Sequence, residues 1–381
     1  MQDVIVVGAG PAGSMAALEL ARRNYDVKVF ESRAAPGVPQ HCTGLVSEKT
    51  FGMLGVEPET INVLHNAEAV FPNGETLSLH SKAPFGVMID RTDLDRKLAE
   101  AAQDAGALYS FNDRYITHTV GLQVGVDCKS GTHRAKMVVG ADGPRSAVAM
   151  SLGENSPKEY LRGFQADLDY QMEDQDTLRI FMGNNVAPGF FAWEIPCGEF
   201  TRIGLCTSMT SAPPSEYLSD FLINRGLKDK VIKVYSGLIP VGGRQYICGD
   251  RCALIGDAAC QVKPLSGGGL YPMCKARGHL VETVSKCLDA DTLSQRDLSE
   301  YDRACKKDFG GDLAKAYSMR KKYVKLSDED FNRFYEYLRK NDVEEQLSNA
   351  DIDNPADVVK EVLSKPKAFI SGIPLLLRFL I

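Results

Sequence analysis

The sequence predicts an α/β fold in which a parallel sheet with helices is interleaved with an antiparallel β-sheet domain and followed by a C-terminal helical region. Three observations support this architecture. A short apolar run at the start leads into glycines and a helical pattern, which is typical of a parallel-sheet unit. Residues 160–245 show a strand-like pattern with recurrent turn glycines. From about residue 296 onward the pattern is helical and rich in charge.

The chain opens with a strand–helix–strand unit of about thirty residues. Val4–Val7 is a continuous apolar strand, Ser14–Arg23 is a helix with small residues, and Val27–Glu31 is a second strand. Between the first strand and the helix lies a G-x-G-x-x-G pattern formed by Gly8, Gly10 and Gly13, with Ala12 at one of its variable positions. Such glycines allow a tight turn, a close approach of backbone to a pyrophosphate, and close packing of helix on strand. The unit therefore predicts a Rossmann-type dinucleotide-binding domain.

An acidic residue completes this pattern. Glu31 ends the second strand, 23 positions after Gly8. A carboxylate there accepts hydrogen bonds from the hydroxyls of an adenosine ribose, and the free N–H groups of the helix N-terminus face the phosphates. The pattern alone does not distinguish FAD from NAD. It does argue against a chance glycine-rich turn, because such a turn would lack the strand, the helix and the acid together.

The return of α/β character after the β-rich part predicts a discontinuous dinucleotide-binding domain. We assign residues 1–60, 86–158 and 246–295 to it, and residues 61–85 and 159–245 to the β-rich substrate domain. Residues 296–381 form the C-terminal helical region. Within the first domain we expect a helix over 93–105, capped by Thr92 or Asp93, and another over 270–288.

Composition excludes several classes of function. The 381 residues carry a net charge of −6, which argues against a nucleic-acid partner. The ten cysteines form no CxxC pair, so we expect no metal site. No signal-peptide pattern opens the sequence and no apolar run reaches the length of a membrane span, so we expect a cytoplasmic protein. The apolar tail 368–381 either contacts the inner face of a membrane or docks in the core of the protein.

Two further motifs indicate FAD. Residues 139–146 read VGADGPRS, and residues 254–259 read LIGDAA, followed by PLSGGGL at 264–270. They resemble the DG and GD motifs of the flavoprotein superfamily that includes p-hydroxybenzoate hydroxylase. The resemblance covers roughly residues 1–290 and implies FAD as the cofactor, with Asp257 at the ribityl region and the glycine-rich loop at the edge of the flavin ring. Arg91 matches an FAD-contacting arginine of that superfamily.

A narrower resemblance concerns two segments on either side of the expected flavin. Residues 39–47, PQHCTGLVS, look like a segment of the geranylgeranyl reductase family, the digeranylgeranylglycerophospholipid reductases included, that lies near the flavin. Residues 188–196, PGFFAWEIP, are similar to that family's P-x-x-Y-x-W-x-F-P motif, which lines the isoprenoid pocket. Phe191 and Ile195 replace the tyrosine and the phenylalanine, so the pocket stays apolar but a hydroxyl is lost.

The resemblances together imply a set of site residues. The cofactor-binding residues would be Gly8, Gly10, Ala12, Gly13, Glu31, Cys42, Gly44, Arg91, Asp257, Gly268, Gly269 and Leu270. Phe191 and Trp193 would bind the substrate, although Trp193 is alternatively a core aromatic residue. Cys42 would be catalytic beside the flavin, and the alternative is a structural thiol.

The implied activity is the reduction of geranylgeranyl double bonds, in archaeal-type ether lipid precursors, by hydride transfer from N5 of reduced FAD. The partners would be an isoprenoid lipid and an external electron donor, either ferredoxin or a nicotinamide, because the sequence has no second G-x-G-x-x-G for a separate NAD domain. Two alternatives stay open: an FAD-dependent aromatic monooxygenase or halogenase, and a flavin electron-transfer protein that feeds a quinone.

Overall fold

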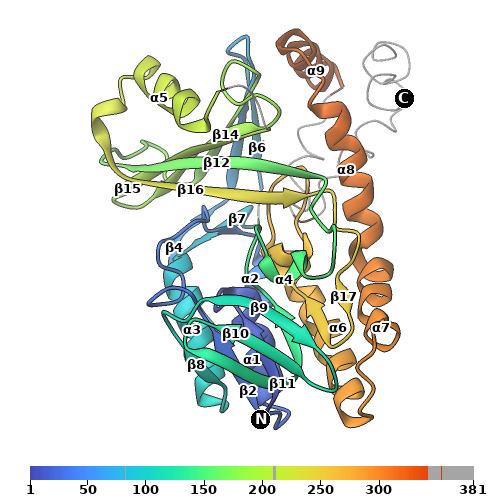
Figure 1. Cartoon of the computed structure of the whole chain (residues 1–381). Coiled ribbons are helices and arrows are strands. Elements are labelled where there is room, and N and C mark those ends of the chain that lie inside the picture. Colours follow the sequence, from blue (N-terminus) through green and yellow to red (C-terminus); the bar gives the residue numbers. More distant parts are fainter. Residues whose placement is uncertain (82, 209–211, 342–352, 354–381) are drawn as a thin grey trace.

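The structure is a computed structural model of the chain, and it describes residues 1–81, 83–208, 212–341 and 353. The apolar tail 368–381 lies outside these residues. The described part has a cofactor half, built on one mixed sheet, and a substrate half, built on a second sheet that lies above it in Figure 1. C-terminal helices run along one side of both halves (Figure 1).

The cofactor half contains an eight-stranded sheet. Its central strands lie in the order β17 (Cys248–Gly249), β18 (Cys252–Leu254), β11 (Gly131–Gly140), β1 (Gln2–Val7), β2 (Val27–Phe30) and β8 (Leu108–Ser110). From β18 to β8 the neighbours are parallel, and β9 (Tyr115–Val120) and β10 (Val124–Cys128) extend β11 as an antiparallel hairpin. The carboxyl ends of β1, β11 and β18 therefore meet at one edge, where a ligand binds in sheets of this type.

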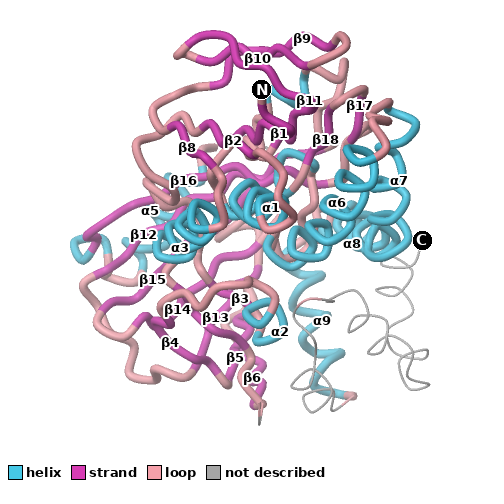
Figure 2. Tube along the Cα trace, turned by 90° about the horizontal axis from the view of Figure 1, so that it is seen from below, coloured by secondary structure: helices cyan, strands magenta, loops and turns pink. Residues whose placement is uncertain are grey.

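Three helices cover one face of this sheet: α1 (Pro11–Ala21), α3 (Arg91–Asp104) and α6 (Leu270–Asp289). Their apolar sides pack on alternate residues of β1 and β2, which include the fully buried Val4, Val6 and Val29. Figure 2 shows these helices side by side below the strands. The other face carries a smaller core with Ile5, beneath the β9–β10 hairpin and α4 (Ala147–Met150).

The substrate half is a seven-stranded sheet. Its order is β16 (Val231–Val241), β12 (Glu159–Leu168), β15 (Phe200–Thr207), β14 (Phe191–Cys197), β13 (Thr177–Met182), β5 (Asn66–Val70) and β6 (Thr76–His80). All neighbours are antiparallel except β13 and β5. Helix α5 (Pro214–Asn224) packs on one face through a cluster that includes Ala166, Ala192 and Leu205. Because side chains alternate along a strand, Gln165, Trp193 and Gly204 lie on the opposite face.

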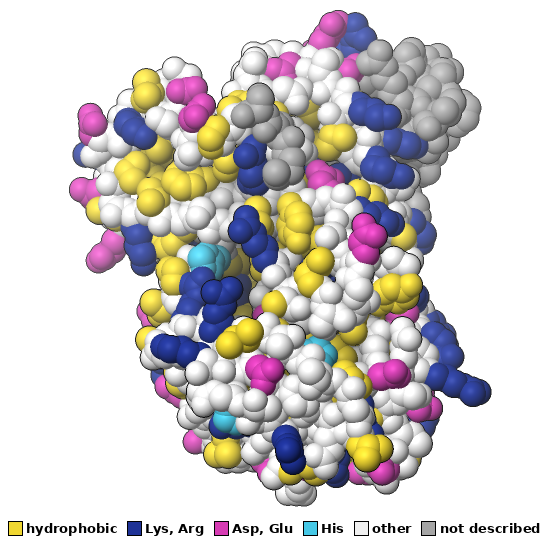
Figure 3. All heavy atoms as spheres, in the orientation of Figure 1, with side chains coloured by type: hydrophobic (Ala, Val, Ile, Leu, Met, Phe, Trp, Pro, Cys, Tyr) yellow, Lys and Arg dark blue, Asp and Glu magenta, His cyan; other side chains and the backbone are white. Residues whose placement is uncertain are grey.

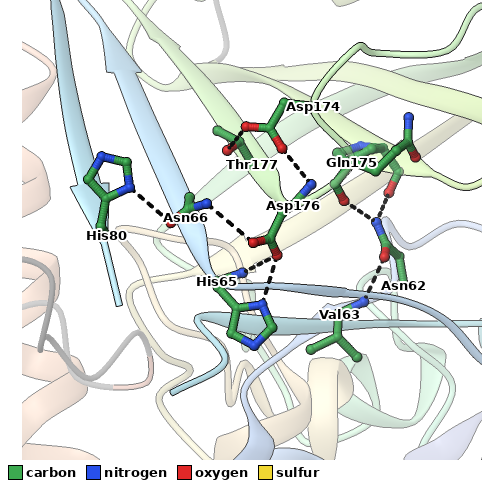
Figure 4. A network of polar contacts seen from close by, with 10 residues as sticks. Asn62, Val63, His65, Asn66, His80, Asp174, Gln175, Asp176 and Thr177 are labelled. Atoms are coloured by element: carbon green, nitrogen blue, oxygen red, sulfur yellow. Dashed lines mark hydrogen bonds and ion pairs between the residues drawn. The ribbon is translucent and has the colours of Figure 1, made fainter. Parts of the chain in front are cut away.

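A three-stranded sheet links the two halves. Strand β7 (Gly86–Ile89) lies between β3 (Leu45–Val46) and β4 (Thr60–Leu64), so β4 belongs to this sheet and not to the large antiparallel one. Short helix α2 (Glu48–Gly52) follows β3. The Asn62 amide of β4 donates to the carbonyls of Gln175 and Pro196, at 2.8 and 3.0 Å, which ties the small sheet to the large one (Figure 4).

The start of β5 is fixed by one carboxylate. Asp176 accepts hydrogen bonds from the backbone N–H of His65, at 3.0 Å, and from the Asn66 amide, and it contacts His65 Nδ1 at 2.8 Å (Figure 4). Asp174 holds the same turn through Thr177. This network sets the register of β5–β13, which is the one parallel pair in the sheet.

As far as residue 341, the C-terminal region is helical, as predicted. It contains α7 (Gln295–Cys305), a π-helical turn over Lys306–Gly310, α8 (Gly311–Tyr323) and α9 (Asp328–Lys340). Helix α7 packs on α6 in the cofactor half. Helix α9 packs its Phe331 and Tyr335 on the β5–β6 hairpin of the substrate half, so α8 bridges the two.

The α/β fold with parallel and antiparallel sheets is confirmed. The predicted cap of the helix at 93–105 was wrong: α3 begins at Arg91, and the Asp90 carboxylate accepts hydrogen bonds from the N–H groups of Thr92 and Asp93. The sequence alone does not distinguish the two caps, because Asp90 and Asp93 are both good capping residues and lie only one turn of helix apart. Among the described helices, none has the length and apolarity needed to cross a membrane.

Candidate cofactor and substrate site

The glycine-rich turn after β1 brings backbone into very close contact. Gly8 has φ +104°, and a Cβ there would lie 2.4 Å from the carbonyl oxygen of Ala141. A Cβ on Gly13 would lie 1.9 Å from the carbonyl oxygen of Gly8. A Cβ on Gly10, in contrast, would meet no atom within 4 Å. Gly8 and Gly13 are thus required for packing, whereas Gly10 leaves open space at the N-terminus of α1, where a phosphate group fits.

The acid after β2 is held against this turn. Glu31 Oε2 accepts the backbone N–H of Ala9 at 2.8 Å, and Oε1 accepts the N–H of Arg33 at 2.9 Å. The carboxylate is therefore fixed beside the open position at Gly10. This arrangement suits the ribose hydroxyls of a dinucleotide, as the sequence predicted.

The GD motif meets the first motif directly. A Cβ on Gly256 would lie 2.7 Å from the Cβ of Ala12, so β18 and the start of α1 are in contact at these two small residues. Asp257 follows, and its Oδ1 would lie 3.1 Å from a Cβ on Gly269. The DG motif has another task, because Asp142 accepts hydrogen bonds from the N–H groups of Ala147 and Val148 and so holds the start of α4.

A cluster of polar and charged side chains lies at the carboxyl edge of the sheet and consists of Arg91, Asp95, Asp257 and Cys42. The buried Arg91 donates from Nη2 to Asp95 at 3.0 Å, and its guanidinium is near enough to the Cys42 thiol for the two groups to interact electrostatically. Burial works to lower the pKa of Arg91, but Asp95 and Cys42 together hold it above its usual value. Burial raises the pKa of Asp257 to about 6, and Arg91 partly opposes this increase.

This cluster has unused hydrogen-bonding capacity, which is the test of whether a cofactor fits. Arg91 Nε is buried and has no acceptor among the described residues. Asp257 is half-buried and surrounded by protein, and a carboxyl in that position can accept sugar hydroxyls. With the open backbone at Gly10, the fixed carboxylate of Glu31 and these two groups, the residues suit the phosphate, ribose and ribityl parts of FAD.

The segment 40–44 lies between the two halves and is held from both sides. On the substrate side, His41 Nδ1 contacts the carbonyl of Ser236 at 2.8 Å, and the carbonyl of Thr43 accepts Arg202 Nη1 at 2.6 Å. On the cofactor side, Ile89 N–H donates to the carbonyl of Gly44 at 3.0 Å. Gly44 has φ +96°, and a Cβ there would lie 2.5 Å from the Ile89 carbonyl oxygen. Cys42 is thereby fixed at the junction.

Cys42 differs from the other nine cysteines of the chain. All ten lie in described residues, and Cys42 is the one that is not buried. Burial raises the pKa of several of the others, among them Cys206 and Cys260, each to about 12, which leaves them unreactive thiols.

Figure 3 shows Lys and Arg side chains and a histidine gathered where the two halves meet.

The glycine-rich loop before α6 faces the aromatic residues of the substrate sheet. A Cβ on Gly267 would lie 3.1 Å from Ile239 Cδ1 and 3.7 Å from Phe190 Cζ. Gly268 is next to the side chain of Lys263, and Leu270 begins α6. The structure thus places the loop predicted for the flavin edge opposite the segment predicted for the substrate.

Three aromatic rings continue from this loop along the sheet. Phe190 and Phe191 stack with ring centroids 4.3 Å apart, and Phe191 meets Trp193 edge to face at 6.3 Å. Phe191 and Trp193 are half-buried and pack on a cluster with Leu161 and Val262. The aromatic wall, which we define as Phe190, Phe191 and Trp193, therefore extends from the cofactor loop into the substrate half.

Arg320 of α8 supports this wall from outside, and no sequence pattern singled it out. Arg320 is 1% exposed, pairs with Glu159 at 2.6 Å, and donates to the carbonyl of Gly189 at 2.9 Å and to Ser208 at 2.7 Å. Tyr323, also on α8, donates to the carbonyl of Phe190 at 2.5 Å. Only a buried arginine in an otherwise charged helix could have indicated this role, and burial is not visible in the sequence.

The predicted site residues fall into two groups in space. One group surrounds the start of α1 and consists of Gly8, Gly10, Ala12, Gly13 and Glu31. The other group surrounds the junction of the two halves and consists of Cys42, Gly44, Arg91, Asp257, Gly268, Gly269 and Leu270. Phe191 and Trp193 face that junction from the sheet. Sequence reasoning missed Gln165 and Arg202, which contact Thr43 from β12 and β15.

Comparisons with known proteins agree with this geometry. Residues 1–214 match a family model described as FAD binding domain. Digeranylgeranylglycerophospholipid reductase 1 of Methanothermobacter thermautotrophicus is 29% identical over 97% of this chain and 96% of its own length. This match confirms the predicted resemblance to that family.

Two solved structures share the fold. The geranylgeranyl bacteriochlorophyll reductase-like protein of Thermoplasma acidophilum has a TM-score of 0.86 at 21% identity and covers 98% of each chain. A mutant of the halogenase PltM, in complex with FAD, has a TM-score of 0.69 at 15% identity and covers 97% of this chain and 86% of its own.

FAD is thus the cofactor, and the enzyme is an FAD-dependent oxidoreductase. The match spans more than half of the chain, from the glycine-rich turn to the end of the strands that carry the aromatic wall. The chain belongs to the FAD binding domain family.

Proposed function

We propose that the protein is an FAD-dependent reductase of isoprenoid double bonds, acting on geranylgeranyl groups of archaeal-type ether lipid precursors. The observation that carries the proposal is the junction itself: the half-buried Cys42 lies beside Arg91 on the cofactor side, and the next residue, Thr43, contacts Gln165, which lies across Gly204 from Trp193 of the aromatic wall. The near full-length similarity to a protein named digeranylgeranylglycerophospholipid reductase supports the same substrate class.

The wall suits an apolar chain. Phe191, Trp193 and Ile239 present carbon to the junction, and Ile195 continues the apolar surface along β14. An isoprenoid double bond has no charge for the protein to bind, so its position depends on such contacts and on exclusion of water. In our proposal the flavin ring lies between residues 42–44 and 267–270, next to this wall.

Reduced FAD, when bound, supplies the hydride for one carbon of the double bond. The chain supplies the proton for the other carbon, and we assign that proton to Cys42 Sγ. The adjacent guanidinium of Arg91 would stabilise the thiolate that remains after transfer, because an opposite charge favours the ionised form. Asp95, which pairs with Arg91, keeps the guanidinium in place.

A direct test separates this activity from the question of the natural electron donor. The FAD-loaded protein is reduced with dithionite without oxygen and given a digeranylgeranylglyceryl phospholipid, and the products are analysed by mass spectrometry. We expect saturation of double bonds in the wild type. We expect Cys42→Ala to lose at least about tenfold in rate while retaining FAD, as is usual for removal of a positioned proton donor.

A matched control is Cys197→Ala, at a buried cysteine in the core of the substrate half. Reduction at the normal rate by Cys42→Ala would remove Cys42 from the mechanism. A wild type that leaves the lipid unchanged, but consumes oxygen and hydroxylates or halogenates an aromatic compound, would contradict the proposed function in favour of the monooxygenase or halogenase alternative. Ferredoxin and a nicotinamide are then compared as donors in the same assay.

A further inference from the structure

Two buried N–H donors on the substrate sheet have no acceptor among the described residues. They are Nε1 of Trp193 and Nε2 of Gln165, and neither atom is accessible to solvent. Gln165 as a whole is 4% exposed. Leaving a buried donor without a partner costs about 1–3 kcal/mol, so a pair of them indicates that something else supplies an acceptor.

The two side chains that carry these donors lie on either side of one glycine. Gly204 of β15 is directly opposite Trp193 of β14 on one side and Gln165 of β12 on the other. A Cβ on Gly204 would lie 2.4 Å from Gln165 Cβ, and 2.7 Å from Cε2 of Trp193, the ring atom bonded to Nε1. The side chains of Gln165 and Trp193 therefore both lie over the position of Gly204. A side chain at residue 204 would occupy that space.

The amide of Gln165 is oriented by the segment that carries Cys42. Gln165 Oε1 accepts the hydroxyl of Thr43 at 2.9 Å, so its N–H group faces away from Thr43. Thr43 is in turn held through its carbonyl by Arg202. The donor pair is thus fixed one residue away from Cys42, on the wall side of the junction.

The charge around the donors indicates what they bind. Arg202 is the cation that contacts Thr43, and its guanidinium is already paired with Asp167, at 2.7 and 3.0 Å. Arg91 interacts with Cys42 from the cofactor side. A phosphate would require cations with free hydrogen-bonding capacity. Two neutral N–H donors instead match a single uncharged acceptor oxygen, such as that of an ether or an ester.

We propose that Gln165 Nε2 and Trp193 Nε1 bind the oxygen that joins the isoprenoid chain to its head group. This inference rests on the proposed function and adds a specificity. In a geranylgeranyl ether the oxygen is on C1 and the first double bond joins C2 and C3, so holding the oxygen places that bond beside Cys42. Bonds farther along the chain reach the same place only after the oxygen has left the donors.

The proposal is tested by which bond is reduced. The probes are geranylgeranyl methyl ether and the hydrocarbon in which a methylene replaces the oxygen, each with dithionite-reduced protein and with products resolved by mass spectrometry. Gln165→Leu and Trp193→Phe each remove one donor and keep most of the volume. With the ether, we expect reduction of the C2–C3 bond to slow about tenfold relative to the distal bonds, which corresponds to one lost hydrogen bond.

With the hydrocarbon, wild type and variants should give the same pattern. A matched control, Gln123→Leu, makes the same change at an exposed position in the cofactor half and should leave both patterns unchanged. FAD content and thermal unfolding show whether a variant is folded. An unaltered ratio of C2–C3 to distal reduction in both folded variants would overturn the proposal.

A second measurement does not depend on turnover. Trp193 is the sole tryptophan of the chain, so protein with a ¹⁵N-labelled indole gives one indole N–H signal in NMR spectra. In oxidised, FAD-loaded protein the ether should move this signal and the hydrocarbon should move it much less, and Gln165→Leu should reduce the difference. A signal that moves when FAD is loaded, and then stays the same with either probe, would assign the acceptor to the flavin and overturn the proposal.

The two arms also separate this inference from the proposed function. If the wild type reduces no isoprenoid but the indole signal still responds to the ether and not to the hydrocarbon, the reductase proposal fails and the oxygen site stands. If the wild type reduces the ether without preference for the C2–C3 bond and the indole signal does not respond, the reductase stands and the oxygen site fails.

Discussion

The cofactor half and the substrate half build their sites in different ways. Around the start of α1 the site is made of backbone: glycines at 8, 10 and 13 decide where chain can approach chain, and one acid orients the rest. On the substrate sheet the site is made of side chains from three strands, and Gln165, Trp193 and Gly204 meet only through strand pairing. A backbone site tolerates almost no change at its glycines, whereas a side-chain site can be altered one group at a time.

The largest expected effect is on the backbone site. In Gly13→Ala the new Cβ would lie 1.9 Å from the carbonyl oxygen of Gly8, so helix and turn must separate. We expect a loss of about 3 kcal/mol or more in the free energy of unfolding, from overpacking against rigid backbone. Urea denaturation of the apoprotein measures this change.

Gly10→Ala is the matched comparison, because its Cβ meets no protein atom. We expect unfolding of the apoprotein to change by less than about 0.5 kcal/mol. FAD affinity should nevertheless fall about a hundredfold or more, since the methyl group occupies the approach to the phosphates. Equal losses of stability in the two variants would show that the glycines do not divide into packing and binding roles.

The next effect concerns the support of the aromatic wall. Arg320→Met leaves Glu159, Ser208 and the Gly189 carbonyl without their partner, and removal of one member of a buried ion pair costs about 3 kcal/mol. We expect isoprenoid reduction to fall while the flavin absorption of the folded protein stays the same. Arg333→Met breaks the exposed pair with Glu329 and should cost at most about 1 kcal/mol.

The double variant Arg320→Met with Glu159→Gln sharpens this prediction. It removes the charge that the single variant leaves unpaired, so we expect it to recover at least about 1 kcal/mol. If Arg320→Met instead lost FAD and kept its activity after FAD was restored, α8 would support the cofactor half and the comparison of the two halves would break down.

The smallest effect is a pH dependence in the cofactor half. Burial raises the pKa of Asp257 to about 6, so in the apoprotein its neutral form is favoured, and the stability it contributes is present below pH 4 and is lost as pH rises through about 6. Sugar hydroxyls that donate to the carboxylate favour the ionised form instead. FAD should therefore bind more weakly as pH falls below about 6, by up to about tenfold per pH unit.

Fluorescence titration of FAD at several pH values measures this dependence. Asp257→Asn cannot ionise, and its FAD affinity should vary little over the same range. A wild-type affinity that stays constant between about pH 5 and 7 would show that Asp257 does not contact the cofactor.

The division between the cofactor half and the substrate half also separates what the sequence predicted from what it did not. The glycine-rich turn and Glu31 lie within one strand–helix–strand unit, so local spacing predicted them. Cys42, Arg91 and Asp257 are far apart in the chain, and only the resemblance to flavoproteins indicated that they belong together. Gln165 and Arg202 carry no motif, and their role depends on register between strands, which sequence patterns do not specify. Arg320 was hidden for a similar reason, since its partners are more than a hundred residues away.

Because α8 supports the aromatic wall, the two halves of the site are completed at different points of synthesis. The residues that we predict to bind FAD are all encoded before Gly311, but the carbonyls of Gly189 and Phe190 gain their donors only when Arg320 and Tyr323 have left the ribosome. If the proposed function holds, changes in α8 can therefore reshape the space for the lipid without touching a residue predicted to bind FAD. For protein engineering, this helix would then be the place to alter chain-length preference while the flavin chemistry is retained.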